Sequence, residues 1–81
     1  MSKELVNTTA GHLSKWSKVK FIDQYNPQVA IDTLTSHEGF DGDIEAEESW
    51  FATAEIDGIE CAVWGNGSMT AESTEIQYVA L

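Results

Sequence analysis

The sequence has 81 residues, 42% of them hydrophobic, and a formal net charge of −10. A chain this short forms one domain, residues 1–81, which buries only about 60% of its extended surface and leaves little room for a deep substrate cavity. Its three Trp, three Phe and two Tyr are more typical of a folded core than of a disordered tail. We expect this core to contain the large aromatic side chains Trp16, Phe21, Trp50, Phe51, Trp64 and Tyr78.

The charge is divided unevenly along the chain. Residues 1–20 contain all four lysines and one acid, Glu4, a net charge of +3, whereas residues 21–81 contain the other thirteen acids and no Lys or Arg, a net charge of −13. Nucleic acid binding replaces condensed counterions with protein cations, so we expect no direct nucleic acid partner. A basic protein surface would attract the acidic part, and we expect the lysines mainly to neutralise it. Solubility or a salt-rich habitat is the alternative reason for the charge.

Cysteine usage and hydropathy bear on the compartment. Cys61 is the single cysteine, so an internal disulfide and a cysteine-based metal site are excluded, which agrees with a reducing environment. No stretch has the length of a membrane span, and the N-terminus lacks the apolar core of a signal peptide. We therefore expect a cytoplasmic protein without membrane contact.

The first half of the chain predicts two helices. Leu13 and Trp16 have loosely helical spacing, which indicates a helix over about Ala10–Asp23 with Thr8 or Thr9 as its cap. The Asn26-Pro27 step begins a second helix, Pro27–His37, because Asn is a good cap and Pro is favoured in the first helical position.

The strongest strand signal is the Asp57-Gly58 pair, a two-residue hairpin turn with a β-rich run on each side. A slip of one residue would mix apolar and polar side chains on both faces, so the hydrophobic pattern selects one register. In that register one face pairs Ile56 with Ile59, Ala54 with Cys61 and Ala52 with Val63, and the other pairs Phe51 with Trp64, Thr53 with Ala62 and Glu55 with Glu60.

The remaining segments complete the predicted sheet. Gly65-Asn66-Gly67 predicts a second turn, and the alternation of Ile76, Tyr78 and Ala80 predicts a closing strand. Met69–Ser73 fits a short strand or a loop. Asp43–Ala54 is best interpreted as a strand, although its Glu and Ala content also suits a helix. The expected fold is α+β, with two N-terminal helices followed by a three- to four-stranded antiparallel sheet.

Acidic residues make up the candidate partner-binding site. In an extended segment, alternate side chains on one face lie roughly 6.6–6.8 Å apart, a step comparable to the spacing of neighbouring phosphates, which exceeds the roughly 3.4 Å axial rise per nucleotide. Such a row could occupy a groove that evolved for nucleic acid. The alternative is a solvated acidic edge that prevents sheet-to-sheet aggregation. The candidate residues are Asp41, Asp43, Glu45, Glu47, Glu48, Glu55, Asp57 and Glu60.

Other motifs give no sign of catalysis. His12 and His37 are isolated from any acid and nucleophile at catalytic spacing, and Cys61 falls on an apolar face, where it serves as a small buried hydrophobe. The run from Asp41 lacks the Gly and Glu that a calcium loop needs at its sixth and twelfth positions. We expect no catalytic residue, no bound metal and no cofactor, and therefore no enzymatic activity.

In size, in charge and in the acids of 41–48 and of the hairpin, the chain resembles the small acidic inhibitors encoded by bacteriophages and other mobile elements, such as anti-CRISPR and anti-restriction proteins. The resemblance implies an inhibitor in the host cytoplasm that blocks the basic, nucleic-acid-binding surface of a defence complex by imitating DNA, although other inhibitors of this type bind uncharged surfaces or force oligomerisation. We expect the chain to be a monomer or homodimer. The alternative function is a small structural or assembly protein that associates with itself through its sheet edge.

Overall fold

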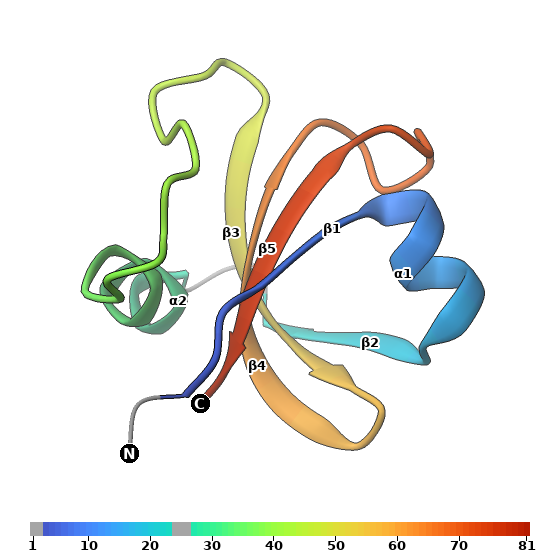
Figure 1. Ribbon diagram of the computed structural model, residues 1–81, viewed down its shortest axis with the longest axis horizontal. Coiled ribbons are helices and arrows are strands. Elements are labelled where there is room, and N and C mark those ends of the chain that lie inside the picture. Colours follow the sequence, from blue (N-terminus) through green and yellow to red (C-terminus); the bar gives the residue numbers. More distant parts are fainter. Residues whose placement is uncertain (1–2, 24–26) are drawn as a thin grey trace.

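The computed structural model describes residues 3–23 and 27–81 and contains there two helices and five strands (Figure 1). All strand pairs are antiparallel, and the strands lie in the order β1-β5-β4-β3-β2 in one sheet. The expected α+β class is confirmed. In chain order the elements are β1 (Val6–Thr9), α1 (Ala10–Trp16), β2 (Val19–Asp23), α2 (Gln28–Thr35), β3 (Ser49–Ile56), β4 (Ile59–Asn66) and β5 (Glu75–Ala80).

Two strands lie where the sequence predicted helix or loop, so the prediction of two N-terminal helices before a three- to four-stranded sheet is partly wrong. The first helix ends at Trp16, because Ser17 is already extended and β2 follows. In β2, Val19 and Phe21 face the core in alternation with an exposed lysine, which is the period of a strand. The expected Thr9 cap is confirmed, since its side chain accepts a hydrogen bond from the backbone N–H of His12.

The hairpin prediction is confirmed in full. β3 and β4 pair in the predicted register from Ile56–Ile59 outward, around Asp57 and Gly58, which both have positive φ angles of 52° and 84°. That backbone conformation is the one a type I′ turn requires, and it explains the Asp-Gly sequence. The closing strand is also confirmed, as β5.

The sheet is buried on both faces. One face packs against Ala10 and Leu13 of α1, and the other packs against Ala30 and Leu34 of α2. Trp64 is fully buried beneath α2, but the expectation that Trp16 belongs to the core is wrong, since its side chain is 67% exposed. The core is therefore made mostly of Ala, Val, Ile and Leu, with one central tryptophan.

Two segments whose structure the sequence left open, 41–48 and 69–73, form loops. Of the expected strand Asp43–Ala54, only the part from Ser49 is extended, and 41–48 is a loop with turns. Met69–Ser73 also lies in turns. Helix α2 falls within the predicted Pro27–His37, whereas its expected cap, Asn26, lies outside the described residues. Within the described ranges, no helix combines the length and the apolar character that crossing a membrane requires.

Candidate functional site

The eight predicted acids fall into two groups at opposite ends of β3 (Figure 1). All eight side chains are exposed. Glu48 and Glu55 are seven positions apart along the chain, which corresponds to roughly 20 Å of extended strand. We call the first group the loop acids and the second the turn acids. The loop acids, before β3, are Asp41, Asp43, Glu45, Glu47 and Glu48; the turn acids, around the β3–β4 turn, are Glu55, Asp57 and Glu60.

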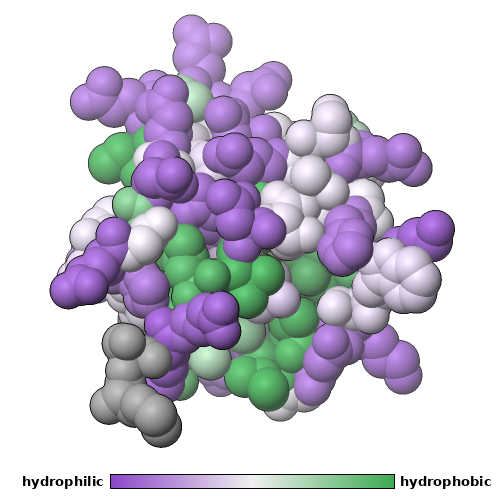
Figure 2. All heavy atoms as spheres, viewed as in Figure 1, coloured by the Kyte–Doolittle hydropathy of each residue, from purple (hydrophilic) through white to green (hydrophobic). Residues whose placement is uncertain are grey.

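The regular row of carboxylates expected at 41–48 is wrong. The segment bends through turns, with hydrogen bonds from the backbone N–H of Ala46 to Asp43 O and from that of Ser49 to Ala46 O, at 3.4 and 3.1 Å. The side chain of Ser49 also donates to Ile44 O. A loop of this kind presents carboxylates in several directions rather than at a constant step. Figure 2 shows hydrophilic side chains crowded at the upper end of the molecule, where this loop lies.

Asp41 has a structural role that the sequence did not reveal. Its carboxylate accepts a 2.7 Å hydrogen bond from Gln77 Nε2, and its backbone N–H points back at Gln77 Oε1 at 3.4 Å. Gln77 is fully buried in β5, so Asp41 satisfies a polar group that would otherwise be costly to bury. Next to it, Gly42 lies so close to Trp64 that a Cβ there would be 2.8 Å from the indole ring. The start of the loop is therefore fixed to the sheet.

Two further acids also hold the backbone. Asp57 Oδ1 accepts a 2.9 Å bond from the N–H of Lys18, and the N–H of Asp57 donates to Lys18 O, which ties the hairpin turn to β2. Asp43 Oδ1 accepts from the N–H of Glu45 at 3.1 Å, a local turn that aspartate commonly makes. These contacts explain three of the eight acids by the fold.

Lysines lie beside the turn acids. Lys20 is opposite Glu55 on β2, and Glu55 is opposite Glu60 on β4. The predicted pair of like charges is confirmed, with one lysine adjacent to it across the sheet. Lys15 lies on α1 over the ring of Trp16, 5.3 Å from its centroid. The chain has no Lys or Arg after residue 20, so the loop acids have no cationic neighbour in their own part of the sequence.

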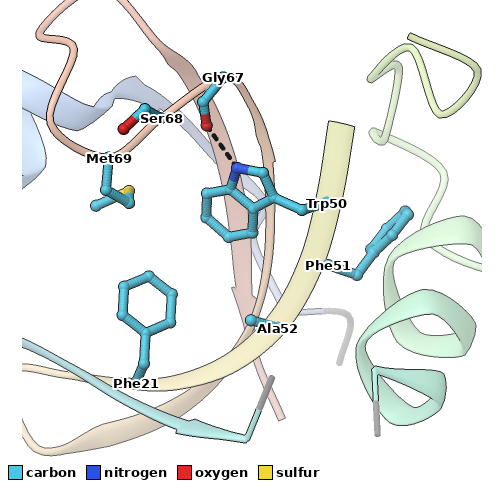
Figure 3. Close-up of a pocket in the computed structure, with 7 residues that line it drawn as sticks. All are labelled: Phe21, Trp50, Phe51, Ala52, Gly67, Ser68 and Met69. Atoms are coloured by element: carbon cyan, nitrogen blue, oxygen red, sulfur yellow. Dashed lines mark hydrogen bonds between the residues drawn. The ribbon is translucent and has the colours of Figure 1, made fainter. Parts of the chain in front are cut away.

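An apolar pocket lies next to the loop acids, on the same end of β3 (Figure 3). It has a volume of about 440 Å³ and is lined by Phe21, Trp50, Phe51, Ala52, Gly67, Ser68 and Met69. In the close-up, Phe21, Trp50 and Met69 surround the opening, and the ring of Phe51 lies on the other side of β3, toward α2. The sequence did not predict this pocket, because its residues come from three segments that are distant in the chain.

Trp50 is held rigidly in the pocket wall. Its Nε1 donates a 2.6 Å hydrogen bond to Gly67 O (Figure 3), and its ring meets Phe21 edge to face with centroids 5.8 Å apart. The indole covers Gly65, its partner on β4, where any Cβ would overlap the ring. Gly67 also donates its backbone N–H to Glu48 O at 3.1 Å. The pocket and the loop acids are thus joined by direct contacts.

The other residues considered for chemistry have structural surroundings. His37 Nδ1 accepts from the N–H of Gly39, and its Nε2 lies 2.6 Å from Lys3 O. Cys61 is buried in the core beneath α1 as predicted. Desolvation by burial raises the pKa of its thiol above the ordinary 9.0, and the nearby Glu60 carboxylate adds to this. The thiol therefore stays protonated at neutral pH, which makes it a poor nucleophile.

Comparisons with known proteins add no relative: no protein-family model matches the chain, and searches of the curated proteins and of the solved structures find no significant similarity.

Proposed function

We propose that the protein is a small acidic inhibitor that binds a basic, nucleic-acid-binding surface of another protein, in the manner of the anti-CRISPR and anti-restriction proteins that its sequence resembles. The observation that carries the proposal is the exposure of three carboxylates in a segment without basic residues, those of Glu45, Glu47 and Glu48. Their side chains are exposed at one end of the sheet, in a part of the sequence without Lys or Arg. Like charges gathered in this way repel one another, and a basic partner would relieve that repulsion.

Within the proposal, we assign the interface to the loop acids, a smaller set than the eight acids predicted from the sequence. Asp57 is hydrogen-bonded to the backbone of Lys18, and Glu55 has Lys20 across the strand, so lysines of the chain lie beside two of the three turn acids, whereas the loop acids have none in their own part of the sequence. The side chains of Asp41 and Asp43 accept hydrogen bonds. Those of Glu45, Glu47 and Glu48 accept none within residues 3–23 and 27–81. Because the loop is not extended, its carboxylates do not repeat at the spacing of phosphates. The support for the proposal is therefore the charge of the loop acids and their exposed position.

Charge reversal at the two ends of β3 tests this assignment. Glu47→Lys with Glu48→Lys changes the net charge by the same amount as Glu55→Lys with Glu60→Lys. We expect the loop pair to weaken binding by about tenfold or more and the turn pair by much less, since only contacts in the interface change affinity directly. The measurement is competition with DNA for purified CRISPR effector complexes and restriction enzymes, repeated over a salt series with each variant's melting temperature checked.

Two outcomes would overturn the proposal. Equal loss in both pairs would mean that only net charge matters. Affinity unchanged between low and high salt would exclude an electrostatic interface, because exposed charge pairs are screened by salt. Sedimentation distinguishes the proposed inhibitor from the alternative, a structural or assembly protein. A stable homo-oligomer whose interface covers the loop acids would identify an assembly protein.

A further inference from the structure

Among residues 3–23 and 27–81, no strand pairs with the outer edge of one half of β3. β2 pairs with β3 only from Ile56 to Thr53, so within the described residues Ser49–Ala52 has no strand on that side. On the other side the same residues are fully paired with β4. An open strand edge presents unpaired backbone groups and is a template for another strand.

The hydrogen-bond pattern identifies which backbone groups point outward. In a two-residue hairpin the closing pair, here Ile56 and Ile59, exchanges hydrogen bonds, and the direction then alternates along the strand. The N–H of Asp57 accordingly points to β2, where it bonds Lys18 O. By the same alternation, Phe51 directs its N–H and C=O away from β4, toward the open edge.

The apolar pocket lies beside this edge. Side chains alternate along a strand, so Trp50 and Ala52, on either side of Phe51, both face the pocket (Figure 3). A strand added next to Phe51 would place the residues that flank its paired residue against Trp50, Phe21 and Met69. The pocket volume of about 440 Å³ falls within the range of roughly 300–1,000 Å³ typical of ligand sites.

The charge around the edge selects the kind of segment that fits. Glu47 and Glu48 immediately precede Ser49, and Glu48 O is bonded to Gly67 in the pocket wall. A segment that lies along β3 therefore passes these carboxylates as it leaves the pocket. Lys or Arg at that point is favoured, while Asp or Glu is repelled.

We propose that the open edge of β3 binds an extended basic segment of the partner protein as an additional strand, with a large apolar side chain of that segment in the Trp50 pocket and its Lys or Arg residues beside Glu47 and Glu48. This mode of recognition combines main-chain hydrogen bonds with a specificity pocket. The existence of the partner rests on the proposed function, whereas the strand-binding edge is testable without it.

The test uses a capped synthetic peptide, Lys-Val-Lys-Phe-Lys-Val-Lys, titrated into the full chain labelled with ¹⁵N. We expect saturable changes at the Phe51 amide and the Trp50 indole N–H. In an antiparallel added strand, the residues on either side of the pocket residue direct their N–H groups at β3. N-methylation of the Lys that follows the central Phe therefore removes a donor to this edge, and we expect about tenfold weaker binding, as for a lost hydrogen bond that leaves a partner unpaired. Replacing the Val and Phe residues of the peptide by Ser tests the pocket, with a loss of similar size expected.

Single variants of the chain complete the design. Glu48→Lys, beside the pocket, is expected to weaken peptide binding about fivefold, and Glu60→Lys, beside the turn at the opposite end of β3, by less than about twofold. Met69→Lys should reduce it at least as much as Glu48→Lys.

Equal binding of the peptide, its N-methylated form and its serine form would overturn strand addition, yet leave the acidic interface of the proposed function intact. The absence of changes at Phe51 and Trp50 at millimolar peptide would also overturn it. Conversely, peptide binding at this edge without competition against DNA would overturn only the proposed function.

Discussion

Asp41 and Gln77 are joined by reciprocal contacts across 36 residues of sequence, with the Asp41 carboxylate and backbone N–H both directed at one buried amide. The loop before β3 is thereby attached to β5, which lies between β1 and β4 in the sheet. Asp41 was predicted as a partner-binding acid, and this geometry gives it a role in positioning the acids that follow it.

Replacing Asp41 separates its charge from its structural role. We expect Asp41→Ala to lower the free energy of unfolding by about 1–3 kcal/mol, because the amide of Gln77 is left buried without its acceptor. Asp41→Asn keeps an acceptor oxygen and loses the charge, and it should be much closer to the parent protein. Urea unfolding measures both. Equal destabilisation by the two variants would mean that the charge, and not the hydrogen bond, matters.

Gly65 is the one glycine in the five described strands, and we predict that replacing it is costly. A Cβ at this position overlaps the Trp50 ring, so Gly65→Ala has to displace a tryptophan that is fixed by Phe21 and Gly67. We expect a loss of roughly 1–3 kcal/mol or more, as in overpacked cores. Gly39→Ala is the control, since its Cβ would make only contacts of 3.4 Å or longer. Similar melting temperatures for the two variants would contradict the packing.

The Glu55–Glu60 pair is predicted to reduce stability. Glu60→Lys turns a repulsive cross-strand pair into an attractive one and should raise the free energy of unfolding by roughly 0.2–1 kcal/mol. Added salt should diminish the gain. Glu75→Lys is a matched control on β5, because its cross-strand neighbours, Thr9 and Asn66, carry no charge. A gain of the same size at Glu75 would show that only the net charge is relevant.

Cys61 gives a prediction for alkaline pH. Burial raises the pKa of its thiol in the folded state above 9.0, so the unfolded chain loses this proton first as pH rises. The thiol's contribution to stability is complete below pH about 9 and declines as pH rises toward the folded pKa. In Cys61→Ala, the free energy of unfolding should decline less steeply with rising pH. Tyr78, whose pKa is also raised by burial, contributes to the decline that remains.

The same burial limits thiol labelling. We expect iodoacetamide to modify native Cys61 only as fast as the protein opens, and quickly in urea, because the reactive form is an accessible thiolate. Mass spectrometry follows the modification. Rapid labelling at neutral pH without denaturant would show that the thiol is accessible in the folded state.

Local patterns predicted the parts of the fold that local physics determines. The Asp57-Gly58 turn and the alternation on each side of it specify the hairpin and its register. β2 was missed because its alternation is short and follows directly on a helical pattern ending at Trp16. β1 was missed because Asn and Thr residues favour turns when considered alone, and they form a strand here by pairing with β5.

The candidate site could be predicted only in part. The excess of acids and their exposure follow from composition, but their arrangement does not, because the segment 41–48 takes its shape from contacts with Gln77 and Trp64 far along the chain. The pocket required Phe21, Trp50 and Met69 to meet, which no spacing in the sequence indicates. Contacts between distant segments determined both features.

The position of β5 has a consequence for how the chain acquires its structure. β5 follows the other four described strands in the sequence, yet it lies between β1 and β4, and Val6 can pair with Tyr78 only after all the residues between them have been synthesised. The chain loses the entropy of closing this long loop before the β1–β5 contacts can stabilise it, and this slows folding. During translation β1 therefore has no pairing strand until β5 is made, and a nascent chain that stops short of β5 lacks the strand against which β1 pairs.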